Sequence, residues 1–138
     1  MKEGKNLEPE SNFQEALRYY KNAKDILRKA KVKDGAYLDR KQVQKSCGIA
    51  YLAVLNALDG YLLQYGIKPQ KLPKSYDEYT QALKKVALKD GKLKTMFNKA
   101  YFGIHIGGYY RAVQDVEMIK IAFSYAKWII EHLTGKKL

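Results

Sequence analysis

The sequence contains very little cysteine, proline or histidine. Cys47 is the only cysteine, so neither a disulfide within the chain nor a cysteine-based zinc site can form. The two histidines, His105 and His132, belong to no His-x-x-x-His or Glu-x-x-His pair of the kind that binds metals on helices. No glycine-rich phosphate loop and no nucleophile elbow occurs. We therefore predict no metal and no cofactor, and the chain fits none of these common enzyme templates.

Long apolar runs are also missing. Residues 1–6 contain no apolar run typical of a signal peptide. The most apolar stretch, residues 47–65, is interrupted by Asn56, Asp59, Gly60 and Gln64. Since a membrane helix needs about 20 largely apolar residues, we expect no membrane span and a cytoplasmic location.

Negative charge is scarce, because 26 basic residues face 14 acidic ones and the formal net charge is +12. Only four of the basic residues are arginines. Residues 68–99 hold nine lysines against three acids and so supply six of the twelve net charges. Lysines are typical of plain solvated surfaces, but a basic surface also attracts anionic partners such as RNA. Both interpretations stay open.

Apolar residues recur with the helical period of 3.6 along most of the chain. Three long stretches and two shorter ones show this pattern, and no alternation of apolar and polar residues typical of strands persists. The pattern predicts an all-α fold, an antiparallel up-and-down bundle of four to five helices. We expect a disordered segment at residues 1–10 and a single domain at 11–134. The predicted helix boundaries rest on caps and breaks at Ser11, Asp34-Gly35, Asp39, Gly66, Ser75, Asp90-Gly91, Gly107-Gly108, Asp115 and Gly135.

The second predicted helix, which follows the cap Asp39, is apolar nearly all round. Such a helix lies at the centre of a bundle or contributes to an oligomer interface. Asn56 and Asp59 are three residues apart on it and share a face. A buried carboxylate needs a partner, which Arg111, Lys99 or a tyrosine hydroxyl can supply. This pair is either a structural clamp or part of a site. Cys47 on the same helix is expected to be a buried, inert thiol.

Residues 98–111 form the most unusual segment, with a histidine, three tyrosines, three glycines and an arginine. A functional interpretation gives His105 an acid–base role and Arg111 an anion-binding role. A structural interpretation treats the tyrosines as packing and the glycines as points of close helix approach. An apolar stripe at Phe102, Ile106 and Tyr109 indicates contact with another helix or subunit. The candidate site residues are Asn56, Asp59, Asn98, His105, Tyr109, Tyr110 and Arg111.

This pattern resembles the HEPN superfamily of small helical bundles over roughly residues 11–133. The resemblance rests on the long apolar helix with Ala57-Leu58-Asp59 and on the late His105 followed by Tyr109. The chain also resembles bacterial domains with a His-x-x-Gly-Tyr-Tyr segment. Many HEPN proteins, found in toxin–antitoxin systems and beside nucleotidyltransferases, are dimeric, metal-independent ribonucleases with an arginine four to six residues before the histidine. Here position 99 is lysine, and Arg111 follows the histidine.

Three functional hypotheses follow from these patterns. The first is a non-catalytic helical interaction module that forms a homodimer or binds a protein partner. The second is an RNA-binding or RNA-cleaving protein of HEPN type, in which His105 is the residue that cleavage requires. The third is a small-molecule binder with a tyrosine-lined cleft between the second and fourth helices, reached by Asp59, His105 and Tyr109.

Overall fold

Helices form where the helical period of apolar residues is bounded by capping side chains. The computed structural model describes residues 8–138. Asp39, Ser75 and Asp115 each accept a hydrogen bond from a backbone N–H of the helix that they precede, as predicted. The helices are α2 (Pro9–Lys29), α3 (Arg40–Gln64), α4 (Tyr76–Val86), α5 (Gly91–Ala100) and α6 (Val116–Thr134), with a 3-10 turn η1 (Pro69–Lys71) before α4 and a π-helix η2 (Tyr101–Tyr110) continuing α5.

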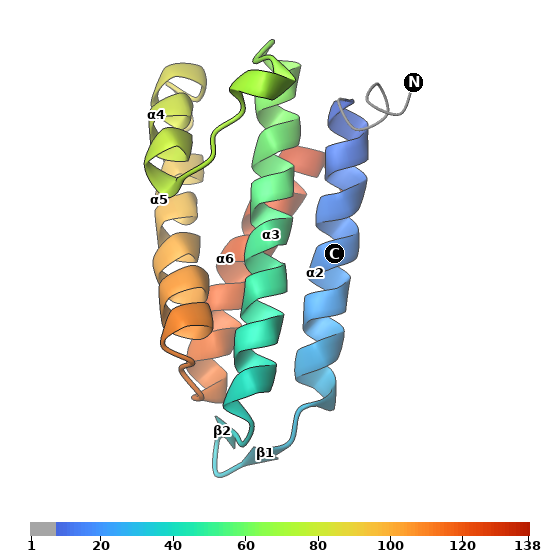
Figure 1. Cartoon of the computed structure of the whole chain (residues 1–138), viewed down its shortest axis with the longest axis vertical. Helices are drawn as coiled ribbons and strands as arrows, with labels where there is room; N and C mark the ends of the chain where they lie inside the picture. The colour runs from blue at the N-terminus through green and yellow to red at the C-terminus, as the bar shows by residue number, and fades with distance from the viewer. Residues whose placement is uncertain (1–7) are drawn as a thin grey trace.

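The long helices run alternately up and down the long axis of the molecule (Figure 1). α2 and α3 lie side by side, α5 and η2 form one continuous rod, α6 packs behind α3, and the short α4 lies beside the upper end of the rod (Figure 1). The predicted all-α, antiparallel up-and-down bundle is therefore confirmed.

The central helix is α3, which contacts α2, α6 and η2. Burial on several sides explains why α3 is apolar nearly all round. By length and composition α3 could cross a membrane, but 56% of its most apolar window is buried inside the bundle. Cys47 is fully buried, as predicted, and burial raises the pKa of its thiol to about 12.

The N-terminal boundary differs from the prediction. α2 begins at Pro9, so Ser11 lies inside the helix and its predicted capping box with Gln14 is wrong. The preceding Glu8 makes no side-chain cap, and Pro9 at the first helical turn already has the φ that a helix needs. Residues 1–7 of the predicted disordered segment 1–10 lie outside the described residues, whereas Pro9 and Glu10 are helical.

A short antiparallel hairpin, absent from the prediction, joins α2 to α3. Strands β1 (Val32–Lys33) and β2 (Ala36–Tyr37) flank Asp34 and Gly35, whose φ angles are +53° and +77°. Asp-Gly is a strong signal for such a turn because both central residues need positive φ. The Tyr37 backbone N–H donates to the Gln114 carbonyl oxygen at 2.8 Å. The hairpin thus holds the segment that links η2 to α6.

The glycine pair Gly107-Gly108 neither ends nor kinks the fourth helix, contrary to expectation. The helix widens at Tyr101 and continues as the π-helix η2 to Tyr110. The Arg111 N–H donates to the Ile106 carbonyl oxygen at 2.9 Å, an i to i+5 bond that defines a π-helix. After it, Ala112 has a left-handed φ of +51° and turns the chain toward α6.

Candidate functional site

The π-helix η2 stacks its aromatic side chains along one face. Hydrogen bonds from residue i to i+5 widen the helical turn, so side chains four and five residues apart become neighbours. The His105 ring lies 5.5 Å from the Tyr101 ring, 5.6 Å from Tyr109 and 5.1 Å from Tyr110, between ring centroids. A straight α-helix would not place both Tyr109 and Tyr110 against His105, so the π-helical geometry builds this stack.

The central helix α3 supplies the floor beneath His105. Tyr51 is 8% exposed, and its ring stacks on the His105 ring with centroids 4.6 Å apart and an interplanar angle of 23°. Burial lowers the pKa of His105 below its ordinary value. This shift favours the neutral imidazole, the form in which a flat, weakly polar ring stacks readily on Tyr51.

Two glycines allow η2 to approach α3 closely. A Cβ atom on Gly108 would lie 2.2 Å from the Cys47 Sγ, so no other residue fits there without movement. A Cβ on Gly48 of α3 would lie 3.1 Å from the Tyr109 ring. The Gln44 amide donates to the Tyr109 carbonyl oxygen at 3.1 Å and adds a polar tie between the two helices. These contacts fix Tyr109 at the edge of α3.

A surface groove of about 330 Å³ lies between α3 and η2. Its surface is mostly apolar, and within the described part of the chain its one charged side chain is that of Lys45. We call it the aromatic groove; its lining residues are Gln44, Lys45, Gly48, Ile49, Tyr51, Leu52, His105 and Tyr109. The arrangement suits a flat or apolar group. Among residues 8–138 no carboxylate lines the groove beside His105, so the described site does not contain the partner that usually orients a catalytic histidine.

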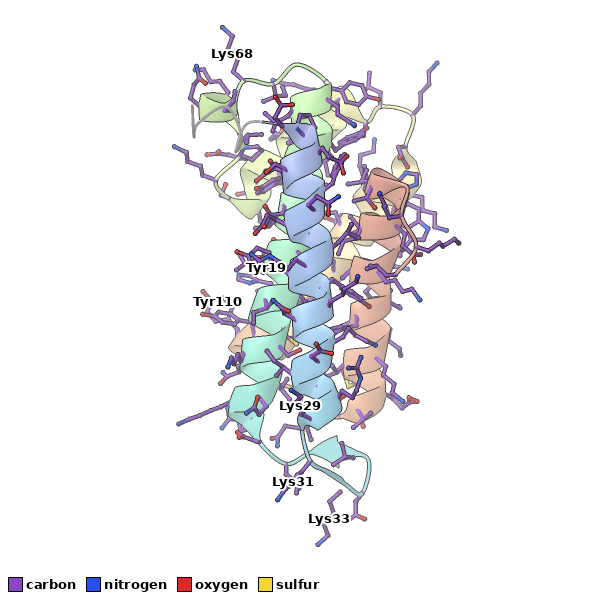
Figure 2. The ribbon with its side chains drawn as sticks, turned by 90° about the vertical axis from the view of Figure 1, so that its right-hand side faces the viewer. Tyr19, Lys29, Lys31, Lys33, Lys68 and Tyr110 are labelled. Atoms are coloured by element: carbon purple, nitrogen blue, oxygen red, sulfur yellow. The ribbon has the colours of Figure 1, made fainter. Side chains whose placement is uncertain are left out.

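Large exposed apolar side chains line the aromatic groove or continue its ring stack. Leu52 is 48% exposed, Tyr109 44% and Tyr110 65%. The ring stack continues through Tyr101 to Phe102, which is 61% exposed. Figure 2 shows Tyr110 of η2 and Tyr19 of α2 projecting from the same side of the bundle. We call Leu52, Phe102, Tyr109 and Tyr110 the apolar rim.

Asn56 and Asp59 lie on α3 but do not line the aromatic groove. The Asp59 carboxylate accepts a hydrogen bond from the Tyr79 hydroxyl at 2.8 Å, and the Asn56 amide donates to the Leu52 carbonyl oxygen at 3.0 Å. Burial raises the pKa of Asp59 to about 6, opposed by the bond from Tyr79. Of the partners considered for Asp59, a tyrosine hydroxyl is the one observed, and the carboxylate does not converge with His105.

The remaining candidate site residues, Asn98 and Arg111, do not line the aromatic groove either. Asn98 accepts a hydrogen bond from the Tyr76 hydroxyl, and the Tyr76 ring stacks on Tyr101 with centroids 3.8 Å apart. Arg111 is exposed at the end of η2 and forms no ion pair within residues 8–138. The structure therefore brings His105, Tyr109 and Tyr110 together and leaves Asn98 at one end of the ring stack and Arg111 just beyond the other.

Sequence reasoning missed Tyr51, Gly48 and Gln44 as parts of this site. Tyr51 lies on the buried face of α3, and this face also supports the His105 ring. A glycine inside an otherwise regular apolar helix was the available signal, because it often marks a close approach of another element. Gly48 meets Tyr109 in that way.

The second histidine, His132, does not line the aromatic groove and contacts Asp90 instead. His132, in the last turn of α6, has its Nε2 2.7 Å from the Asp90 carboxylate, and its ring stacks on Trp128. Asp90 also caps α5, so this contact clamps α6 to the start of α5. Within the described part of the chain, no three metal-ligating side chains gather closely enough to hold an ion.

The comparisons with known proteins identify a family. Residues 11–135 match the model of the family described as "Domain of unknown function (DUF5618)". No curated protein matches the chain. A solved structure of a protein of unknown function from Dyadobacter fermentans is 36% identical, with a TM-score of 0.75, and the match covers 91% of this chain and 94% of that one. The chain therefore belongs to the DUF5618 family.

Proposed function

We propose that this domain is a non-catalytic interaction module that self-associates through the face made by α3 and η2. The observation that carries this proposal is the apolar rim around the aromatic groove, where Leu52, Phe102, Tyr109 and Tyr110 are between 44% and 65% exposed. Large exposed apolar side chains gathered around one groove are typical of interaction surfaces. Aromatic residues are also enriched at the energetic centres of such interfaces.

A second copy of the chain suits this face because of its charge. The net charge of +12 makes two copies repel each other over most of their surfaces. Of the described residues that line the aromatic groove, Lys45 alone is charged, so repulsion between copies is small at this face. In an isologous dimer, Tyr110 of one copy would pack into the aromatic groove of the other. The resemblance to HEPN proteins, which face each other as dimers, supports the same arrangement.

Sedimentation velocity across a micromolar concentration range tests this proposal. We expect a dimer for the unmodified chain and a monomer for Tyr110→Glu, because a carboxylate cannot enter an apolar partner groove without a large desolvation cost. Ile121→Glu is the matched control, since it adds the same charge and Ile121 of α6, which is 54% exposed, lies outside the aromatic groove and rim. A monomeric unmodified chain would contradict the proposal, as would equal dissociation by the control variant.

RNA binding of HEPN type is a second candidate function. The observation that favours it is the exposed Tyr109 and Tyr110 rings, which lie close to the cationic Lys45 and next in sequence to Arg111. Exposed aromatic rings beside cations are used to stack bases of single-stranded RNA. Lys99, which holds the position of the HEPN arginine, places its Nζ over the Tyr125 ring of α6 and not beside His105. This candidate therefore concerns binding more than cleavage.

Fluorescence anisotropy with a single-stranded RNA across a salt series distinguishes the two candidates. RNA binding weakens steeply with salt, because phosphate contacts release counterions, whereas an apolar dimer does not. Tyr109→Ala with Tyr110→Ala should abolish the binding, and Lys84→Gln with Lys85→Gln on α4 should leave most of it intact. Unchanged affinity in the tyrosine variant would exclude this face as the RNA site. A His105→Ala variant that still cleaves RNA would exclude His105 from cleavage.

A further inference from the structure

A second groove, of opposite character, lies between α2 and α6. Its volume is about 450 Å³, within the range of sites for small molecules. It shares no lining residue with the aromatic groove. We call it the basic groove; its lining residues are Tyr20, Lys21, Lys24, Asp25, Arg28, Lys127 and Leu138.

Positive charge in the basic groove is poorly compensated. Lys21, Lys24 and Arg28 recur at intervals of three and four residues and therefore share one face of α2, and Lys127 joins them from α6. Within residues 8–138 the lining acids are Asp25, which already forms an ion pair with Arg28, and the backbone carboxylate of Leu138, so the four cations outnumber the two anions. No ion pair involves the three lysines within residues 8–138. Like charges held together in this way repel each other unless an anion binds between them.

The hydroxyl of a largely buried tyrosine also faces the basic groove. Tyr20 is 5% exposed and lines the groove, and no group in the described chain forms a hydrogen bond with its hydroxyl. Every fully enclosed polar side-chain atom of the described residues has a hydrogen-bond partner. Since the Tyr20 hydroxyl has no such partner, it is not fully enclosed and is accessible from the groove. Burial, and then the charge of Glu131, raise the pKa of Tyr20 to about 12, so the hydroxyl remains a donor at neutral pH.

We propose that the basic groove binds a small phosphorylated molecule through a di- or triphosphate group. Lys24 and Lys127 would hold the phosphate oxygens from the two helices, and the Tyr20 hydroxyl would donate a hydrogen bond from the floor. A chain of phosphates fits this groove better than a single carboxylate does, because several cations line it and each can meet a separate charged oxygen. The basic groove and the aromatic groove of the proposed dimer face have no described lining residue in common. The triphosphate proposal and the dimer proposal can therefore fail independently of each other.

Isothermal titration calorimetry of the full chain with inorganic triphosphate tests this site. We expect saturable binding of one triphosphate per chain at constant ionic strength. Lys24→Gln with Lys127→Gln should weaken the affinity by at least about tenfold, because a hydrogen-bonded ion pair contributes 1.5 kcal/mol or more. Tyr20→Phe removes only the hydroxyl and should weaken it by about tenfold, since that bond reaches a charged acceptor. The circular dichroism spectrum of each variant shows whether it is folded.

Lys84→Gln with Lys85→Gln is the matched control, because it removes the same charge from exposed positions on α4. The control should bind triphosphate within about twofold of the unmodified chain, since distant surface charges are screened. A parallel titration with ATP separates the two sources of a triphosphate: tighter binding of ATP indicates a nucleotide, and equal binding indicates the phosphate chain alone. The proposal is overturned by absence of saturable binding, by equal loss in the control, or by unchanged affinity in the Lys24 and Lys127 variant.

Discussion

The contact between Gly108 of η2 and Cys47 of α3 yields a sharp prediction about stability. In Gly108→Ala the new methyl group would lie 2.2 Å from the Cys47 Sγ and 2.8 Å from its Cβ. Cys47 is fully buried, so the thiol cannot rotate into solvent to make room. Insertion of a methyl group into a packed core costs about 1–3 kcal/mol, and the greater helix propensity of alanine returns up to about 1 kcal/mol. We expect a net loss of about 2 kcal/mol in the free energy of unfolding.

Removal of the thiol should partly restore the variant. Cys47→Ala alone should cost about 1 kcal/mol, because it removes one buried heavy atom and leaves a small cavity. In the double variant the 2.2 Å contact is gone and only the contact between the two Cβ atoms remains. The two substitutions should therefore be less harmful together than the sum of their separate effects, by about 1 kcal/mol. Urea unfolding followed by far-ultraviolet circular dichroism measures all four chains.

A matched glycine serves as the control for Gly108. Gly91 begins α5, and a Cβ atom there would meet nothing within 4 Å. Gly91→Ala should keep or slightly raise stability, because alanine reduces the freedom of the unfolded chain. If Gly108→Ala were as stable as the unmodified chain, or if its loss were the same with and without the Cys47 thiol, the close approach of η2 to α3 would be refuted.

Three further predictions concern Asp59, Ser75 and Tyr51. Because burial raises the pKa of Asp59 from 3.8 to about 6, its contribution to stability is greatest below pH 4 and falls by up to about 3 kcal/mol as pH rises through 6. Asp59→Asn should remove this dependence in urea unfolding at pH 4 and pH 7, and an identical pH dependence in both chains would contradict it. Ser75→Ala should cost about 1 kcal/mol, because Ser75 caps α4 by accepting from the Glu78 N–H; a change below a few tenths of a kcal/mol would mean that the cap is dispensable. Tyr51→Ala should raise the pKa of His105 toward its ordinary value in an NMR titration, because the covering ring is lost, and an unchanged titration would show that Tyr51 does not bury the imidazole.

The candidate site was only partly predictable. The sequence indicated that residues 98–111 were unusual and named His105, Tyr109 and Tyr110, which the structure stacks together. The positions of these rings could not be predicted from an α-helical period, because the π-helix changes the spacing of neighbours from three and four residues to four and five. The expected stripe of Phe102, Ile106 and Tyr109 assumed the wrong helical geometry for the same reason. The sequence also left the partner of Asp59 open, and Tyr79, twenty residues farther along the chain, fills that role.

Local chemistry determined much of this fold. Helical periodicity and the caps Asp39, Ser75 and Asp115 place the helices, because a cap bonds backbone groups within its own first turn. Even the missed hairpin is encoded locally, by Asp34 and Gly35. Tertiary packing alone decided the rest. Gly108 lets η2 pass close to Cys47 of α3, and the basic groove exists because the bundle brings Lys24 of α2 and Lys127 of α6 to the same cavity. Such contacts join residues far apart in the sequence, and their geometry depends on how whole helices pack.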